Sequence, residues 1–396
     1  MSEWQTFCLK DLGKIVGGAT PSTNNPKNYG NKIAWITPKD LSTLQGRYIK
    51  KGSRSISRLG FKSCSCVLLP KHAILFSSRA PIGYVAIAKK RLCTNQGFKS
   101  IIPNKKIYFE FLYYLLKYHK DNISNIGGGT TFKEVSGATL GLFKVKIPPT
   151  YYEQQKIART LSILDQKIEN NHKINELLHK ILELLYEQYF VRFDFLDENN
   201  KPYQTSGGKM KFSKELNRLI PSGWSVRFLN HKIVSTYQPK TISKTLLNDS
   251  YSYSVYGGGG IIGRFTEYNH EQSEFIISCR GQCGISYLTL PKSWITGNAM
   301  VIRPTKSYTS KTYLYHTIKK YKLTNYITGS VQPQITRQNL STMPILIPKR
   351  KTLNKWNNIS SLLWNLIHNN MQSTQTLTAI RDFLLPLLLK QQVKPQ

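Results

Sequence analysis

The chain has 396 residues, with 56 Lys and Arg against 21 Asp and Glu and a formal net charge of +35 at pH 7. This length indicates more than one domain, and a hydrophobic fraction of 40% with 23 Tyr and 16 Phe excludes wholesale disorder. Such a charge exceeds what solubility requires, so we expect an anionic partner, for which nucleic acid is the natural candidate. An ordinary basic protein with a solvated surface is the alternative interpretation.

Two further features bear on the class of protein. Residues 1–4 carry no basic and apolar leader, and no run approaches the roughly 18 apolar residues that span a bilayer, so we expect a cytoplasmic protein without a membrane partner. The six cysteines form no CxxC pair and the histidines lack zinc-ligand spacing, so we expect reduced thiols and no metal site. The cysteines are Cys8, Cys64, Cys66, Cys93, Cys279 and Cys283.

The first 150 residues carry short apolar runs such as 66–69, 73–76 and 84–88, punctuated by Gly, Pro and Asn, and a helical stretch at 109–118. This pattern predicts a mixed α and β domain over 1–150. Over 151–192 the apolar spacing alternates between three and four residues, which predicts a long coiled-coil helix with a polar centre. Its predicted seam is Ile157, Leu161, Leu164, Ile168, Asn171, Asn175, Leu178, Leu182, Leu185 and Tyr189.

Residues 193–220 read as a connector, of which 194–208 are polar, turn-rich and expected to be exposed. A second mixed domain is predicted over 221–349, with a helical stretch at 313–321, and a second long helix over 350–390. Pro386 should kink or end that helix, because proline lacks the backbone donor and clashes with the preceding turn. The second predicted seam is Ile359, Leu363, Leu366, Asn370, Ser373, Leu377, Ile380, Leu384 and Leu387.

The two halves of the chain repeat each other with a period near 200 residues, so each repeat is a whole domain. The segment 129–148, GTTFKEVSGATLGLFKVKIP, aligns without a gap onto 329–348, GSVQPQITRQNLSTMPILIP. FSSRAPIGY at 76–84 likewise faces ISCRGQCGI at 277–285, and the two long helices correspond at an offset of 199. The fold class is therefore mixed α/β with an internal pseudo-two-fold repeat.

Two similar helices in one chain can satisfy each other's apolar stripes, and Asn171 facing Asn370 would fix their register. The alternative is that each stripe packs on its own domain. The residues assigned to helix pairing are Leu164, Ile168, Asn171, Leu178, Leu185, Leu363, Ile367, Asn370, Leu377 and Leu384.

Sequence signatures of catalysis are missing. The glycines at 127–129 and 257–260 lack the Lys and Ser or Thr of a phosphate-binding loop. We find no GxSxG elbow, no HExxH helix and no dinucleotide fingerprint, and few acidic residues are present to hold catalytic magnesium. The pattern favours a binding protein without catalytic residues.

Several segments resemble the specificity subunits of type I restriction-modification systems, and the resemblance covers essentially the whole chain. The most specific are PPTYYEQQKIARTLSILDQKIENN at 148–171 and FVRFDFLDENNKPYQTSGGKM at 190–210. IPSGW at 220–224, YSVYGGGGIIGRF at 253–265 and GSVQPQIT at 329–336 are similar to landmarks of that family's second recognition domain. The chain departs from the family at KRKTLNKW, after Pro348, and at its closing LLPLLLKQQVKPQ.

The resemblance implies two target-recognition domains joined by two long antiparallel coiled-coil helices, each domain reading one half of a split double-stranded DNA site. It also implies two methyltransferase subunits, which use S-adenosylmethionine, docked on the helices. The assembly can recruit two restriction subunits, which use ATP and magnesium. No cofactor is implied for this chain itself.

Base edges are read by Arg, Asn, Gln, Ser and Thr, whereas Lys mostly holds phosphate. On that chemistry the predicted DNA-binding residues of the first domain are Ser77, Arg79, Thr94, Asn95, Gln96, Thr130, Thr131 and Lys133. Those of the second are Ser278, Arg280, Gln282, Asn298, Ser330, Gln332, Gln334 and Arg337. A structural role is the alternative: Arg79 and Arg280 could anchor turns beside their glycines.

The leading hypothesis is a sequence-specific DNA recognition subunit without catalytic activity. One alternative is a basic scaffold that binds DNA or RNA without sequence preference. The other is a catalytic DNA methyltransferase or nuclease, against which the missing motifs argue. Competition by unrelated DNA and RNA separates the first two, and activity of the purified chain alone tests the third.

Overall fold

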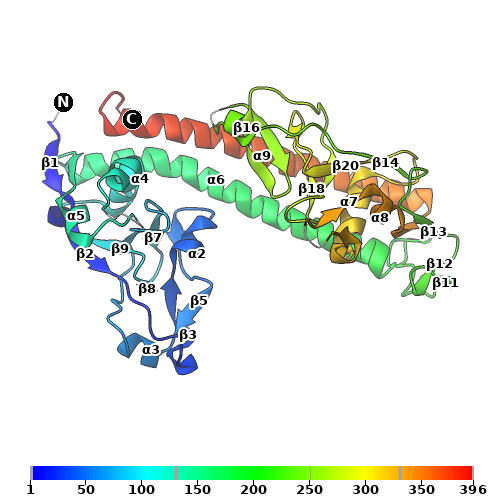
Figure 1. Ribbon diagram of the computed structural model, residues 1–396, viewed down its shortest axis with the longest axis horizontal. Helices are drawn as coiled ribbons and strands as arrows, with labels where there is room; N and C mark the ends of the chain where they lie inside the picture. Colours follow the sequence, from blue (N-terminus) through cyan, green and yellow to red (C-terminus); the bar gives the residue numbers. More distant parts are fainter. Residues whose placement is uncertain (1–2, 129–132, 250, 330–331, 395–396) are drawn as a thin grey trace. The chain divides into compact units, whose positions relative to one another are not determined.

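The computed structural model describes residues 3–128, 133–249, 251–329 and 332–394. Its contacts divide the chain into two compact units, Met1–Lys173 with Asn370–Gln396, and Ile174–Asn369. Two long helices, α6 (Tyr151–Tyr186) and α9 (Arg350–Leu389), run through both units (Figure 1). Each unit therefore holds one globular domain and part of each long helix.

The first domain is built on a five-stranded sheet of order β2-β9-β6-β7-β4 and a three-stranded sheet of order β5-β3-β8. Strand β1 pairs with β10 beside the long helices. The strands are β1 (Gln5–Cys8), β2 (Gly13–Gly17), β3 (Tyr29–Ile36), β4 (Tyr48–Ile49), β5 (Arg54–Ile56), β6 (Ile74–Phe76), β7 (Val85–Ala88), β8 (Cys93–Thr94), β9 (Lys99–Pro103) and β10 (Lys144–Ile147). The helices are α1 (Leu9–Leu12), η1 (Pro26–Asn28), α2 (Pro38–Ser42), α3 (Arg58–Lys62), α4 (Phe109–Asn125) and α5 (Gly137–Leu142).

The core of the first unit joins the domain to the long helices. Helix α4 is apolar over its first half, where Phe111 and Leu112 are fully buried against β6 and β7. The same core takes in Leu161 of α6 and Leu388 of α9. The long helices are thus held by burial of apolar side chains, the dominant stabilising contribution in folding.

The second domain has a four-stranded sheet of order β14-β20-β17-β18 and a three-stranded sheet of order β16-β15-β19. The strands are β11 (Met210–Ser213), β12 (Arg218–Pro221), β13 (Ser225–Phe228), β14 (Val234–Tyr237), β15 (Tyr253–Gly257), β16 (Gly260–Phe265), β17 (Phe275–Ser278), β18 (Ser286–Leu288), β19 (Trp294–Ile295), β20 (Ala299–Pro304), β21 (Ile327–Thr328), β22 (Gln334–Ile335) and β23 (Pro344–Ile347). The helices are η2 (Glu187–Val191), η3 (Lys244–Leu246), α7 (Lys311–Lys320), η4 (Leu323–Tyr326) and α8 (Arg337–Ser341).

The strand pairing repeats between the domains. Strand β1 pairs with β10 in the register Gln5 to Ile147, and β13 pairs with β23 in the register Ser225 to Ile347. Parallel pairs also correspond, β3 with β8 and β15 with β19. The repeat seen in the sequence is therefore a repeat of the fold, and the mixed α/β prediction with two long helices is confirmed.

Within each unit the two long helices run antiparallel. In the first unit, Asn171 donates from Nδ2 to the carbonyl of Asn370 (3.4 Å) and to Oγ1 of Thr374 (3.2 Å). In the second, Asn175 donates to the carbonyl of Ile367 (3.3 Å). The polar centre of the predicted seam therefore makes hydrogen bonds between the helices.

Part of the second predicted seam is wrong. Ile359, Leu366 and Ile380 are exposed. In its first half α9 buries a different face, which carries Trp356 and Trp364, because these large aromatic side chains pack on the second domain. The alternative, in which a stripe packs on its own domain, describes this half of α9.

Two other expectations need correction. Of the two outcomes predicted for Pro386, an end of helix α9 is wrong, since the last turn continues to Leu389 and the N–H of Lys390 donates to the Pro386 carbonyl (2.9 Å). The start of the connector is not exposed throughout, because Phe195 is buried among aromatic rings. A proline removes its own backbone donor, but its carbonyl can still accept from the residue four positions on, so the helix can continue past Pro386.

All six cysteines are free thiols. In the part of the chain that the structure describes, no helix is both long and apolar enough to cross a membrane. Over the same residues, no three His, Cys, Asp or Glu side chains are grouped to hold a metal ion.

Candidate nucleic-acid interface

Three of the segments predicted to read DNA meet at Ser78 in the first domain. The Ser78 N–H donates to the carbonyl of Gly97 (2.8 Å), and its own carbonyl accepts from the N–H of Val135 (3.0 Å). The backbone of Ser78 thus holds segments 77–84, 94–97 and 133–135 together through hydrogen bonds. We call these segments loop cluster 1.

The turn at 77–84 is fixed by Ser77. Its Oγ donates to the Pro81 carbonyl (2.8 Å) and accepts from the N–H of Tyr84 (2.8 Å). Gly83 closes the turn at φ +102°, in the left-handed region that favours glycine, and its N–H donates to the Ser77 carbonyl (3.0 Å). This rigid turn carries Arg79 at the surface.

The charge of loop cluster 1 is predominantly positive. Glu134 lies between Arg79 and Lys99, with Oε2 to Nη1 and Oε1 to Nζ distances both 3.3 Å. The neighbouring Lys133 is exposed. Because partly exposed ion pairs contribute only about 0–1 kcal/mol, a DNA phosphate could compete with Glu134 for these cations.

The second domain builds the same arrangement around Cys279. We call segments 278–285, 297–298 and 332–337 loop cluster 2. The Cys279 N–H donates to the carbonyl of Asn298 (3.0 Å), and its carbonyl accepts from the N–H of Ile335 (3.0 Å). Ser278 Oγ donates to the Gln282 carbonyl and accepts from the N–H of Ile285 (2.8 Å), as Ser77 does in the first domain.

Loop cluster 2 brings residues that are predicted to bind DNA close together. Sequence segments 278–285 and 328–337 contain no Asp or Glu. Arg280 pairs with Gln334 through an antiparallel bridge. Gly281 at φ +73° and Gly284 at φ +89° shape the turn that presents Arg280 and Gln282. The local field is therefore suited to an anion.

The structure sorts the predicted DNA-binding residues into three groups. Ser77, Thr94 and Ser278 are buried inside the clusters, where the two serines stabilise turns and do not face solvent. Thr130, Thr131 and Ser330 lie outside the described residues. The exposed or half-exposed residues are Arg79, Asn95, Gln96, Lys133, Arg280, Gln282, Asn298, Gln332, Gln334 and Arg337.

Sequence reasoning missed a fourth segment in each cluster. In the first domain the N–H of Ala19 donates to the Thr94 carbonyl (3.0 Å), and Thr20 donates from Oγ1 to Oε1 of Gln96. Gly18 lies so close that an added Cβ would be 2.0 Å from the Asn95 carbonyl oxygen. The paired glycines of GGATP at 17–21 were the available signal.

The corresponding segment of the second domain follows β14. Gln238 donates from Nε2 to Sγ of Cys279 (2.8 Å). A Cβ on Gly297 would lie 2.8 Å from the Pro239 carbonyl oxygen and 2.7 Å from Oγ1 of Thr241. Residues 238–241 therefore border loop cluster 2 as residues 18–20 border loop cluster 1.

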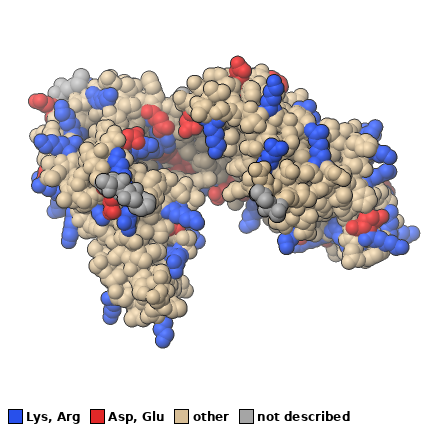
Figure 2. All heavy atoms as spheres, in the orientation of Figure 1, with Lys and Arg blue, Asp and Glu red and all other residues tan. Residues whose placement is uncertain are grey.

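The wider surface shares the positive charge. Figure 2 shows Lys and Arg distributed over the face in view, with fewer Asp and Glu among them. In the second domain Lys240 and Lys244 are exposed next to the fourth segment. Such a surface attracts polyanions over a Debye length of about 10 Å at 0.1 M salt.

Comparisons with known proteins agree on one family. Residues 1–180 and 221–379 match the family described as "Type I restriction modification DNA specificity domain". The chain is 32% identical over 424 residues to the type I restriction enzyme MjaIX specificity subunit of Methanocaldococcus jannaschii, covering 98% of this chain and 93% of that protein. It is 31% identical over 191 residues to the HindI specificity subunit of Haemophilus influenzae, covering 46% of this chain and 40% of that protein.

A solved structure shares the fold. The type I restriction-modification S subunit from M. genitalium superposes with a TM-score of 0.60 at 18% identity, covering 98% of this chain and 96% of that one. At that identity the likeness is one of fold.

Proposed function

Because this chain belongs to the family of type I restriction-modification DNA specificity subunits, which are recognition components and not catalytic chains, we propose that each domain reads one half of a split double-stranded DNA site. Loop cluster 1 would contact one half-site and loop cluster 2 the other. The alternatives, a basic scaffold without sequence preference and a catalytic chain, are not favoured.

The observation that carries the proposal is a repeated frame with different exposed side chains. The backbone bonds at Ser78 and Cys279 are the same in both domains. Around that frame the first cluster presents Asn95, Gln96 and Lys133, whereas the second presents Gln282 and Arg337 among others. One frame with two sets of donors and acceptors suits two half-sites of different sequence.

We further propose that two methyltransferase subunits bind the long helices. In the second unit, α6 exposes Ile174, Leu177, Ile181 and Leu184 at a helical spacing of three and four residues. Apolar stripes of this kind on a protein surface mark interaction sites. A partner that packs on this stripe would bury it.

The repeat supports two such partners. At an offset of 199 residues, Ile181 and Leu184 correspond to Ile380 and Phe383 of α9, which are exposed in the first unit. We propose that these partners supply S-adenosylmethionine chemistry, and that two restriction subunits using ATP and magnesium can join the assembly. The complex would act in the cytoplasm, where the DNA is.

The test is a genome-wide map of methylated bases in cells that carry the chain with a methyltransferase partner, compared with cells that lack only this chain. One split motif with a fixed gap should lose methylation when the chain is absent. Unchanged methylation would contradict the proposal.

Two variants assign the half-sites. Arg79→Ala should relax base preference in one half-site and Arg280→Ala in the other, because losing a bidentate contact costs about 1–3 kcal/mol. Lys201→Ala in the exposed connector removes the same charge and should leave the motif unchanged. If either arginine variant altered both halves equally, the assignment of one half-site to each domain would be wrong.

A further inference from the structure

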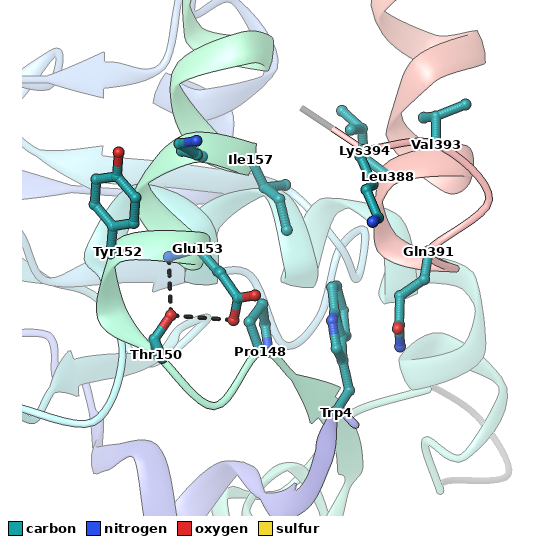
Figure 3. A pocket seen from close by; sticks show the side chains of 11 residues that line it. Trp4, Pro148, Thr150, Tyr152, Glu153, Ile157, Leu388, Gln391, Val393 and Lys394 are labelled. Atoms are coloured by element: carbon teal, nitrogen blue, oxygen red, sulfur yellow. Dashed lines mark hydrogen bonds between the residues drawn. The ribbon is translucent and has the colours of Figure 1, made fainter. Parts of the chain in front are cut away.

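A pocket in the first unit lies outside the loop clusters. It has a volume of about 490 Å³ and is bordered by the start of α6, the end of α9 and the residue before β1. Figure 3 shows the Trp4 ring reaching between Ile157 of α6 and Gln391 beyond α9. Leu388 and Val393 add further apolar surface.

The second unit has an equivalent position, where the chain after α6 occupies part of the space and leaves a smaller pocket of about 330 Å³ beside Trp224 and Phe195. Trp4 precedes Gln5, which pairs with Ile147, and Trp224 precedes Ser225, which pairs with Ile347. The two tryptophans are therefore equivalent. Trp224 is 1% exposed, whereas Trp4 is only partly buried.

The filling comes from the chain that follows α6. The rings of Phe193 and Phe195 lie 5.6 Å and 5.2 Å from that of Trp224, and Phe195 is stacked on it at 18°. Both phenylalanines are buried, at 2% and 7% exposed. Aromatic contacts of this geometry contribute beyond the area that they bury.

The sequence explains why the first pocket stays open. At the helix offset of 199 residues, Phe195 corresponds to Lys394, and Phe193 to Gln392. The end of α9 thus supplies flexible polar side chains where the end of α6 supplies rings. The Trp4 pocket therefore has the apolar side chains at its base, but no ring stands in the place that Phe195 takes in the second unit.

A lysine is retained at the edge of both sites. Lys355 donates from Nζ to the Leu196 carbonyl (3.4 Å), which holds the connector just before the acidic residues Asp197 and Glu198. Its equivalent at the same offset is Lys156, which lines the Trp4 pocket and lies over the Tyr152 ring, 5.1 Å from its centroid. Lys394 adds a second positive charge to the pocket, and Glu153, which accepts from Oγ1 of Thr150 (3.0 Å), contributes one negative charge.

We propose that the Trp4 pocket docks an extended segment of a partner protein, in which an aromatic side chain is followed within a few residues by carboxylates. The aromatic ring would pack on Trp4, Ile157 and Leu388, and the acidic residues would face Lys156 and Lys394. The partner is a different protein, because in a second copy of this chain Phe193 and Phe195 are already buried against Trp224. This docking would be independent of whether the two domains read DNA half-sites.

The probe is a fluorescein-labelled peptide with the sequence of residues 192–203, RFDFLDENNKPY, added to the full-length chain. Fluorescence anisotropy should show saturable binding. Lys156→Glu should weaken it at least tenfold, and a peptide with Phe195→Ala should not bind. The matched control is Lys355→Glu in the second unit, which should leave the affinity unchanged, and thermal unfolding of each variant checks that it folds.

Three results would overturn the proposal. The first is no saturable binding by the folded wild-type chain. The second is weaker binding by Lys355→Glu and not by Lys156→Glu, because the peptide would then be exchanging with the connector at Trp224. The third is self-association in sedimentation experiments that Lys156→Glu abolishes, because the occupant would then be a second copy of this chain.

Discussion

Arg47 is a guanidinium held inside the first unit, with its side chain 3% exposed. Nη1 lies 3.1 Å from Oε1 of Glu110 on α4, and Nε lies 3.3 Å from Oε1 of Glu169 on α6. Asp165 completes the group, accepting from Tyr114 (2.6 Å) and from Arg381 of α9 (2.8 Å). The network ties the domain to both long helices.

Arg47→Met should destabilise the first unit by about 3–5 kcal/mol, because it leaves the mostly buried carboxylates of Glu110 and Glu169 without the guanidinium that pairs with them. Urea unfolding followed by circular dichroism should show a midpoint lower by roughly 1–2 M for the transition of that unit. The matched control is Arg58→Met at an exposed position of the same domain, which should change stability by no more than about 0.5 kcal/mol. A small effect of Arg47→Met would mean that solvent reaches the network.

At the scale of single residues, the sequence predicted which segments lie together in each loop cluster better than which of their side chains are exposed. Arg79 and Arg280 lie at the surface as DNA-binding residues must, but the equally repeated Ser77 and Ser278 are buried turn residues. Repetition marks a constraint without saying whether it is structural or functional. The role of Gly18 could not be predicted, because its partner Asn95 is far away in sequence.

Among the elements, α7 and α9 share a buried cluster of histidine and tryptophan. His316 of α7 stacks with Tyr186 and lies edge-on to Trp356, and His368 of α9 contacts Trp364. Burial, with Lys319, His179 and Lys320 nearby, lowers the pKa of His316 to about 3. Burial, with Lys311 and His179 nearby, lowers the pKa of His368 to about 4.

The second unit should therefore lose stability in acid. An unfolded histidine has a pKa near 6.5, so below that pH the unfolded chain takes up protons that the folded chain does not. The stability present above pH 6.5 falls as the pH approaches 4, by on the order of 2 kcal/mol for each histidine at pH 4.5. Urea midpoints measured at pH 7 and pH 4.5 give this difference.

Replacing one histidine isolates its contribution. His316→Phe keeps a ring in the aromatic cluster but cannot be protonated, so the loss between pH 7 and 4.5 should shrink by on the order of 2 kcal/mol. His231→Gln, at an exposed position, is the control and should leave the loss unchanged. An unaltered pH dependence in His316→Phe would show that other groups govern the acid response.

The exposed stripes of the long helices lead to a prediction about assembly. Leu184→Asp on α6 should remove one methyltransferase from the complex and Phe383→Asp on α9 the other, because a carboxylate cannot be buried in an apolar contact without a partner. Native mass spectrometry of the purified assembly should show one methyltransferase in place of two. Asn199→Asp adds the same charge to the exposed connector and should retain both.

The helices also show what the spacing of apolar residues can and cannot predict. A spacing of three and four residues predicted both long helices and the polar contact of Asn171 with Asn370. It failed on α9, where Leu366 is exposed and Trp364 is buried. The spacing of apolar residues predicts which face of a helix is apolar but not which element packs on it. Here the second domain, which precedes α9 in the chain, covers the tryptophans.

For the whole molecule, the internal repeat was the most informative feature of the sequence. It predicted two copies of one fold, which the matched registers of β1 with β10 and β13 with β23 confirm. It could not predict the difference between the Trp4 and Trp224 positions. That difference depends on how much space Lys394 and Phe195 fill at equivalent places, which is a property of packing.

The net charge of +35 leads to a prediction for the whole molecule. It distinguishes the electrostatic attraction to DNA of any sequence from the recognition of one target sequence. Each phosphate contact releases condensed counterions, so the logarithm of the binding constant should fall linearly with the logarithm of salt concentration, with a slope of about −0.9 per contact. Lys133→Ala should make that slope shallower by about one, on target and unrelated DNA alike.

Gln282→Ala should behave differently, because an amide reads base edges without releasing counterions. We expect it to weaken binding to the target by roughly tenfold, to leave binding to unrelated DNA unchanged and to keep the slope. Fluorescence anisotropy of the assembled complex over a salt series gives both quantities for both variants. If Gln282→Ala altered the slope, or weakened binding to both DNAs equally, loop cluster 2 would be holding the phosphate backbone and the base contacts would have to lie elsewhere in the second domain.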